Sequence, residues 1–106
     1  MDPKKRKRLE AAGWTVGDAA AFVKLTPEES ALVEMRLALS RTLRERRQAA
    51  GLTQTALAKQ LGSSQSRVAK LEGGDASVSL ELLIRALLSV GASRKDVANA
   101  LARRVA

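Results

Sequence analysis

The sequence predicts an all-α fold of five helices preceded by one short helix, and three observations support this prediction. Apolar residues recur at offsets of three and four along the 106 residues, and no alternating run is long enough to indicate a strand. Both prolines, Pro3 and Pro27, lie at or before expected helix starts. Aromatic residues make up only 2% of a chain that is 45% hydrophobic, so Leu, Val and Ala must build a core of closely packed helices.

Composition narrows the class of function. The net charge of +8 favours a polyanionic partner, and nucleic acid is the first candidate. The chain has no cysteine and no histidine, which excludes disulfides, zinc sites, and thiol or imidazole catalysis. We therefore expect a protein that is not an enzyme and has no cofactor or metal. Because no apolar run of about eighteen residues and no signal peptide is visible, we also expect a cytoplasmic protein without a membrane partner.

Residues 1–26 form a predicted N-terminal extension in two parts. The first part, MDPKKRKR, holds five of the nineteen basic residues and cannot bury itself. It is either a solvated tail or an arm that reaches along or into a DNA groove; a nuclear import signal is a third interpretation. In residues 9–25, Thr15 and Asp18 resemble the capping box of a short helix. Trp14 is expected to anchor this segment on the main body, although a lone tryptophan is also a common partner anchor.

The domain predicted at residues 27–106 begins with the strongest helix start in the chain. Thr26, Pro27 and Glu29 supply a capping threonine, a proline at the first helical position and a glutamate at the third. No proline or glycine follows until Gly51, so this helix spans about twenty-three residues, roughly 34 Å. Its apolar stripe consists of Leu32, Met35, Leu39, Leu43 and Ala50, widened by Val33 and Leu37. Its first half is more apolar than one small core requires, so we expect it to pack against the N-terminal segment or a second subunit.

Two short helices joined by a glycine turn follow in the stretch TQTALAKQLGSSQSRVAKLE. Thr53 caps the first helix, and Gly62 ends it because glycine adopts positive φ without a Cβ clash. Ser64 caps the second helix. The buried positions of the pair are Leu57, Ala58, Leu61, Val68 and Leu71. Ala58 gives the small side chain that a close helix crossing needs, so the stretch predicts a helix-turn-helix; an ordinary helical hairpin without a ligand is the alternative.

Two further helices complete the predicted core. Ser79 caps the first of them, and Gly91 ends it. Its apolar residues are Leu80, Leu83, Ile84, Leu87 and Leu88. Ser93 and Asp96 form a capping-box pattern at the start of the last helix. That helix carries Val97, Ala100, Leu101, Arg104 and Val105.

The two-helix motif resembles the Cro and cI repressor class, the XRE family of helix-turn-helix proteins, over roughly residues 39–91. The matching residues are Gln54, Ala58, Gly62, Val68, Leu71 and Glu72. The resemblance implies a structural ion pair between Arg47 and Glu72. The longer pattern TPEE, RERR, SSQSRVAKLE and GASRKD resembles HigA-type antitoxins, which pair with a small ribosome-dependent ribonuclease toxin and repress their own operon. The loop at residues 73–79 lacks the basic residues that similar repressors place there, so it is not expected to clamp the DNA backbone strongly.

A helix-turn-helix inserts its second helix into the major groove N-terminus first, which assigns roles to the polar side chains. We expect base contacts from Gln65, Ser66 and Lys70 and backbone contacts from Gln54, Ser64 and Arg67. One domain of this size makes few base contacts, so we expect a homodimer on a palindromic operator in double-stranded DNA.

The predicted function is therefore sequence-specific transcriptional repression. The resemblance adds the role of an autoregulating antitoxin in a type II toxin-antitoxin pair, in the bacterial cytoplasm and at the nucleoid when bound to its operator. Two alternatives stay open: a stand-alone phage or chromosomal repressor without a toxin, and a protein-interaction module that retained the fold.

Overall fold

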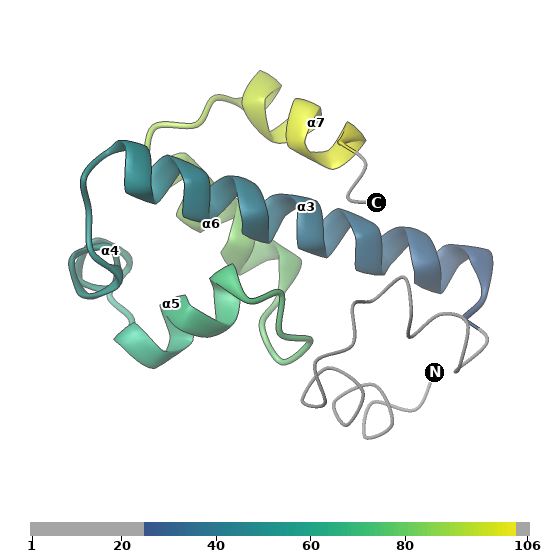
Figure 1. The fold of residues 1–106 in the computed structure, drawn as a ribbon, viewed down its shortest axis with the longest axis horizontal. Helices are drawn as coiled ribbons and strands as arrows, with labels where there is room; N and C mark the ends of the chain where they lie inside the picture. Colours follow the sequence, from purple (N-terminus) through teal and green to yellow (C-terminus); the bar gives the residue numbers. More distant parts are fainter. Residues whose placement is uncertain (1–24, 104–106) are drawn as a thin grey trace.

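The computed structural model describes residues 25–103, which form five α-helices and no strand (Figure 1). The helices are α3 (Pro27–Ala49), α4 (Gln54–Leu61), α5 (Gln65–Glu72), α6 (Leu80–Ser89) and α7 (Arg94–Ala102). The all-α fold class and the five helices of the main domain are thus confirmed. The basic block, the short helix expected in residues 9–25, Trp14, Arg104 and Val105 lie outside the described residues.

Side-chain caps begin each described helix at the predicted residue. In α3, Thr26 Oγ1 accepts a hydrogen bond from the Glu29 N–H at 3.1 Å, and Glu29 Oε1 accepts one from the Thr26 N–H at 3.1 Å. Ser93 and Asp96 form the same reciprocal pair at α7. There, the hydrogen bonds from the backbone and side chain of Ser93 lower the pKa of the Asp96 carboxyl from its usual value. The hydroxyls that cap α4, α5 and α6 belong to Thr53, Ser64 and Ser79.

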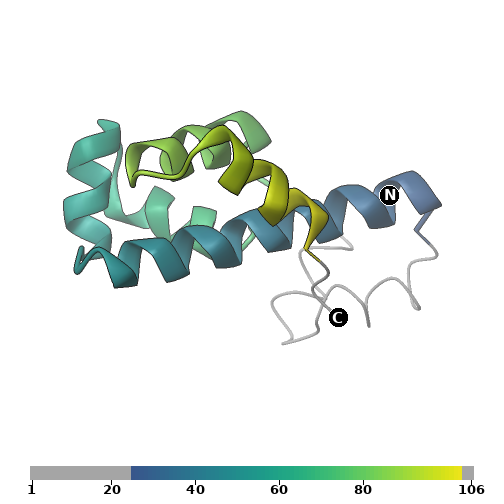
Figure 2. The ribbon, with the colours of Figure 1, turned by 90° about the horizontal axis from the view of Figure 1, so that it is seen from above.

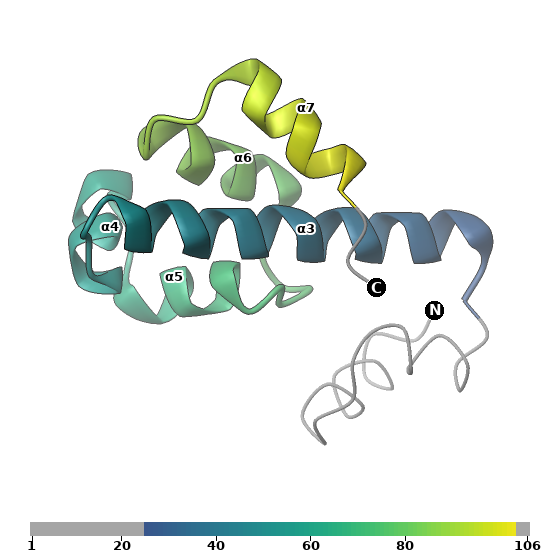
Figure 3. The ribbon, with the colours of Figure 1, turned by 45° about the horizontal axis from the view of Figure 1, so that its top comes forward.

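The long helix α3 is the element on which the other helices assemble. Figure 1 shows α7 along one side of α3, α5 along the other, α6 behind it and α4 beside its C-terminal end. α3 contacts α5, α6 and α7, while α4 contacts α5 and α6. The first turns of α3 extend past the other described helices, as Figures 2 and 3 show from two further directions.

Leucine side chains dominate the core, as the lack of aromatic residues predicts. The fully buried large residues are Leu39, Leu43, Leu57, Val68, Leu71, Leu83 and Leu87. Of the predicted α3 stripe, Leu39 and Leu43 belong to this core, Met35 is half-buried, and Leu32 (51% exposed) and Ala50 are exposed. Leu32 is in the second turn of α3, and Ala50 is the C-terminal cap residue. The stripe is therefore fully buried at Leu39 and Leu43, and Val33 nearer the start of α3 is also buried.

The loop between α5 and α6 packs closely against α3. Gly74 has a φ of +70°, and a Cβ atom there would lie 2.8 Å from Leu37 Cδ2, so glycine suits both the backbone and the space. The Arg36 guanidinium donates a hydrogen bond to the Val78 carbonyl. Ser40 is 2% exposed, and its Oγ has no hydrogen-bond partner in the described structure. The contact between α3 and this loop thus leaves one buried hydroxyl uncompensated.

Ser40→Ala is expected to stabilise the protein by about 1 kcal/mol or more, because a buried unsatisfied polar group costs about 1–3 kcal/mol. The matched control is Ser89→Ala, also in a helix, which removes a hydrogen bond of 2.8 Å from Ser89 Oγ to the Ala86 carbonyl. Urea titrations of the three proteins give the free energies of unfolding. A Ser40→Ala protein no more stable than the parent would contradict this account of the buried hydroxyl.

Arg47 and Glu72 form an ion pair that connects α3 to α5. Arg47 Nε lies 2.5 Å from Glu72 Oε2, and Arg47 Nη2 lies 3.0 Å from Glu72 Oε1, so the contact is bidentate. Arg47 Nη1 also donates to the Leu52 carbonyl at 2.7 Å. The two side chains are only 12% and 4% exposed. One guanidinium therefore joins the end of α3, the turn before α4 and the last residue of α5.

Arg47→Ala is expected to lower the free energy of unfolding by about 3–5 kcal/mol, because it leaves the Glu72 carboxylate buried without a partner. The control Arg103→Ala removes a pair with Glu45 whose side chains are 41% and 55% exposed, and should cost about 0–1 kcal/mol. Combining Arg47→Met with Glu72→Leu should recover much of the loss, since apolar replacement of a buried pair is often neutral. Equal losses for Arg47→Ala and Arg103→Ala in chemical denaturation would count against a structural role for the buried pair.

Candidate nucleic-acid interface

The helices α4 and α5 form a compact two-helix unit around a glycine turn. Gly62 adopts the left-handed conformation with a φ of 63°, and a Cβ there would meet no atom within 4 Å, so glycine is needed for its backbone and not for space. The Ser63 N–H donates to the Ala58 carbonyl at 2.9 Å and closes the end of α4. Ala58 is 3% exposed and packs in the core beside α5. This is the geometry that the spacing of Ala58 and Gly62 predicts.

The two sides of α5 differ sharply in chemistry. Val68 and Leu71 are fully buried and fix one side of the helix against the core. The residues exposed on the remaining surface of the helix are Gln65, Ser66, Arg67, Ala69 and Lys70. Ser66 and Lys70 are four residues apart and share one side of α5, with Arg67 on the neighbouring flank. A short helix thus presents amide, hydroxyl and cationic groups to the outside.

A chain of hydrogen bonds connects the start of α5 to the buried ion pair. Gln65 Nε2 donates to Gln54 Oε1 at 2.7 Å, and Gln54 Nε2 donates to Glu72 Oε1 at 3.2 Å. Glu72 is in turn held by Arg47. Because a side-chain amide has two N–H donors and an oxygen acceptor, Gln65 keeps its oxygen and one N–H for a further partner. The hydrogen bonds that begin at the buried Arg47–Glu72 pair thus hold the side-chain amide of Gln65 in one orientation.

The serines at the start of α5 lie together beside this chain. Ser64 Oγ lies 3.2 Å from Ser66 Oγ and also accepts a hydrogen bond from the Arg67 N–H at 3.2 Å. Of the six residues predicted to contact DNA, four therefore gather where α5 begins: Gln54, Ser64, Gln65 and Ser66. The side chains of Arg67 and Lys70 are exposed farther along α5, and neither has an ion-pair partner within residues 25–103.

The electrostatics of these two helices differ from those of the rest of the domain. The first turns of α3, α6 and α7 contain acidic residues, whereas the first turns of α4 and α5 contain none. The partial positive charge at the N-termini of α4 and α5 is therefore not offset by a carboxylate of the same turn. Lys59, Arg67 and Lys70 add three positive charges to the motif, and no acidic residue occurs between Thr53 and Leu71. Such a surface favours an anionic partner such as the phosphate backbone.

The exposed residues of the motif that were missing from the predicted set include Ala69 and Lys59. Ala69 lies four residues after Gln65 on the exposed surface of α5, and Lys59 is exposed on α4. Helical periodicity could have placed Ala69 there, but the prediction considered only polar side chains of α5 as base readers, and it assigned no role to Lys59. The loop after α5 has no basic residue; Asp75 Oδ1 accepts a hydrogen bond from the Ser77 N–H at 2.7 Å.

In residues 25–103 there is no group of three or more His, Cys, Asp or Glu side chains that could hold a metal ion. Among the helices that the structure describes, none is long and apolar enough to cross a membrane.

Comparison with known proteins agrees with the geometry of the motif. A family model described as a helix-turn-helix domain matches residues 38–101, which is more than half of the chain. No curated protein and no solved structure matches the sequence. A helix-turn-helix places its second helix in the major groove, so the match indicates a DNA-binding regulator. This chain belongs to the helix-turn-helix domain family.

Proposed function

We propose that this protein is a sequence-specific transcriptional repressor that reads its operator with α5. The observation that carries the proposal is the hydrogen-bonded chain from the Arg47–Glu72 pair through Gln54 to Gln65. A side chain that is held in place before it binds a base loses less affinity, because ordering a side chain on binding costs free energy. The chain orients Gln65 in this way while leaving an acceptor and a donor for the N6 and N7 edge of adenine.

The other exposed residues of the motif receive roles from their position. Ser66 and Lys70 lie on the same side of α5, so they are proposed to contact bases farther along the groove, with Lys70 directed to guanine O6 or N7. Arg67 on the flank and Ser64 at the cap are proposed to contact phosphates, aided by the N-terminal amides of α4 and α5. Gln54 Nε2 has a second N–H beyond its bond to Glu72, which is available for a phosphate.

The proposed DNA-bound form is a homodimer on a palindromic operator. A single α5 of eight residues reaches only a few bases, whereas two copies related by a two-fold axis read half-sites about one helical turn apart. We also propose two parts for the chain, a basic extension at residues 1–26 and the helix-turn-helix domain at residues 27–106. The charge of the extension would favour DNA contact, and deleting residues 1–8 tests whether it adds affinity.

A finer proposal is that the repressor is the antitoxin of a toxin-antitoxin pair, acting in the bacterial cytoplasm and at the nucleoid. Its support is the resemblance of TPEE, RERR, SSQSRVAKLE and GASRKD to HigA-type antitoxins. The reading frame next to the gene is the decisive observation. A small basic ribonuclease-like protein that arrests growth alone, and not when this chain is co-expressed, would support the antitoxin role. A neighbourhood without such a gene would favour a stand-alone repressor.

Gln65→Ala and Arg67→Ala are expected to affect DNA binding in different ways. The operator is first selected from a random duplex library with the parent protein. Gln65→Ala should then lose about 1–3 kcal/mol for that operator and almost nothing for unrelated DNA, because a base contact carries sequence information. Arg67→Ala should weaken binding to both and reduce the slope of log affinity against log salt by about one, as expected for a phosphate contact.

The matched control for these variants is Arg41→Ala, which removes an exposed positive charge from α3. It should leave the preference for the operator intact. If Gln65→Ala and Arg67→Ala both bind the operator like the parent protein and melt normally, α5 does not lie in the groove. The interaction-module alternative would then replace the repressor proposal.

A further inference from the structure

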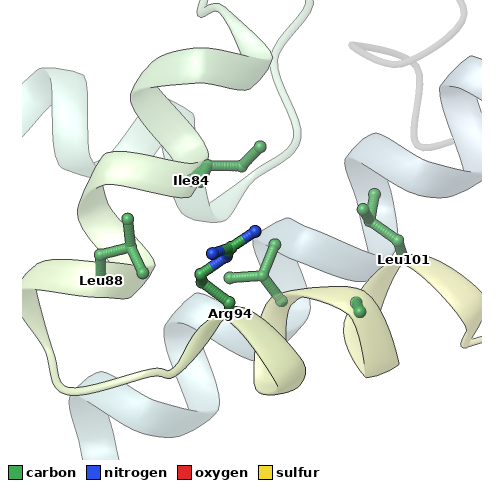
Figure 4. Close-up of a pocket in the computed structure, with 6 residues that line it drawn as sticks. Ile84, Leu88, Arg94 and Leu101 are labelled. Atoms are coloured by element: carbon green, nitrogen blue, oxygen red, sulfur yellow. The ribbon is translucent and has the colours of Figure 1, made fainter.

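A small pocket lies between α6 and α7, away from the α4–α5 motif (Figure 4). Its volume is about 230 Å³, and we name it the α6–α7 pocket. It is lined by Ile84 and Leu88 of α6 and by Arg94, Val97, Ala98 and Leu101 of α7. Small-molecule sites usually measure about 300–1,000 Å³. This pocket is below that range, and its size suits one or two apolar side chains of a partner better than a metabolite.

The floor of the pocket is apolar and open to solvent. Leu88 is 46% exposed, although Leu87 beside it in the sequence is fully buried. On α7, Arg94, Ala98 and Leu101 follow a spacing of four and three residues, so the wall extends over about two helical turns, or about 10 Å. An amphipathic helix carries its apolar side chains at the same spacing and length. The shape therefore fits a short helix laid along α7.

Arg94 brings a positive charge to the otherwise apolar lining of the pocket. Figure 4 shows the Arg94 side chain extending into the space between Ile84 and Leu88 of α6 and Leu101 of α7. In the described part of the chain, Arg46, Arg47 and Arg103 each have a carboxylate partner, and Arg94 has none.

The two helices that line the pocket carry further positive charge. Arg85 on α6 and Lys95 on α7 are exposed, and neither forms an ion pair within residues 25–103. Glu81 is the acidic residue on this side of α6, three positions before Ile84. With Arg94 included, α6 and α7 carry three positive charges and one negative charge without an ion-pair partner in the described residues, because Asp96 of α7 pairs with Arg46 of α3. A partner that carries carboxylates beside its apolar side chains would complement this surface.

Two other occupants fit the pocket less well. A DNA backbone would meet the cations but would bury the charge of its phosphates against Leu88 and Ile84, which offer no hydrogen bonds. A second copy of this chain, related by a two-fold axis through the pocket, would bring the same cations of both copies together. We propose that the α6–α7 pocket is the docking site for an acidic amphipathic helix of a different protein. An apolar side chain of that helix enters the pocket, and a carboxylate pairs with Arg94.

The test uses the full chain and two synthetic peptide probes of about four helical turns. Both probes have the same leucine stripe, and they differ only in flanking residues, which are Glu in one and Lys in the other. Fluorescence anisotropy should show that the Glu probe binds at least about tenfold more tightly than the Lys probe. Arg94→Glu should reverse this preference, and Leu88→Ser should weaken binding of both probes. Arg41→Glu, an equal charge change on α3, should alter the preference by less than about twofold.

Other outcomes would overturn the proposal. Equal affinity for the two probes, no binding of either, or a preference unchanged by Arg94→Glu would each remove charge complementarity as its basis. Displacement of the Glu probe by duplex DNA would assign the surface to nucleic acid. Loss of a dimer in Leu88→Ser, measured by sedimentation, would assign it to a second copy of this chain. Because the affinities of the two probes are measured before any DNA is added, their comparison does not depend on the repressor proposal.

Discussion

The buried Arg47–Glu72 pair is the constraint on which the candidate interface depends. An isolated helix of eight residues is not stable in water, so α5 must be held by its neighbours. Val68 and Leu71 bury one side of α5. Apolar packing is non-directional, so it does not by itself fix the orientation of the helix. The bidentate ion pair fixes the end of α5 to α3. The same carboxylate orients Gln54, which orients Gln65. The proposed base-reading amide is thus connected to the longest helix of the fold.

The fold could be predicted closely because its helix boundaries depend on local chemistry. Thr26, Ser64 and Ser93 cap helices through bonds to residues three positions away, and such signals are complete within a few residues of sequence. Features that join distant segments could not be predicted in the same way. The burial of Ser40 and the fit of Gly74 against Leu37 depend on the loop after α5 returning to α3, more than thirty residues away along the chain.

The candidate site also combines features that could be predicted from local sequence with features that could not. Periodicity placed Gln65, Ser66, Arg67 and Lys70 on the exposed surface of α5, where the structure has them. The bond between Gln54 and Gln65 could not be predicted, because it depends on how α4 and α5 cross and on the side-chain conformations that the crossing permits. The prediction assigned Gln54 to phosphate alone, whereas in the structure Gln54 also connects Gln65, the proposed base reader, to the buried Glu72. The position of Arg94 in the α6–α7 pocket likewise follows from helix packing and not from its place beside the Ser93 cap.

The most direct test of the account is an NMR titration of the isotope-labelled protein with duplex DNA that carries the selected operator. The side-chain amides of Gln54 and Gln65 give their own signals, so the experiment observes the proposed reading group itself. The account predicts that the largest shifts occur at these two amides and along the first turns of α4 and α5, with Leu88 and Leu101 unchanged. Largest shifts at α6 and α7, with both glutamine amides unmoved, would contradict it.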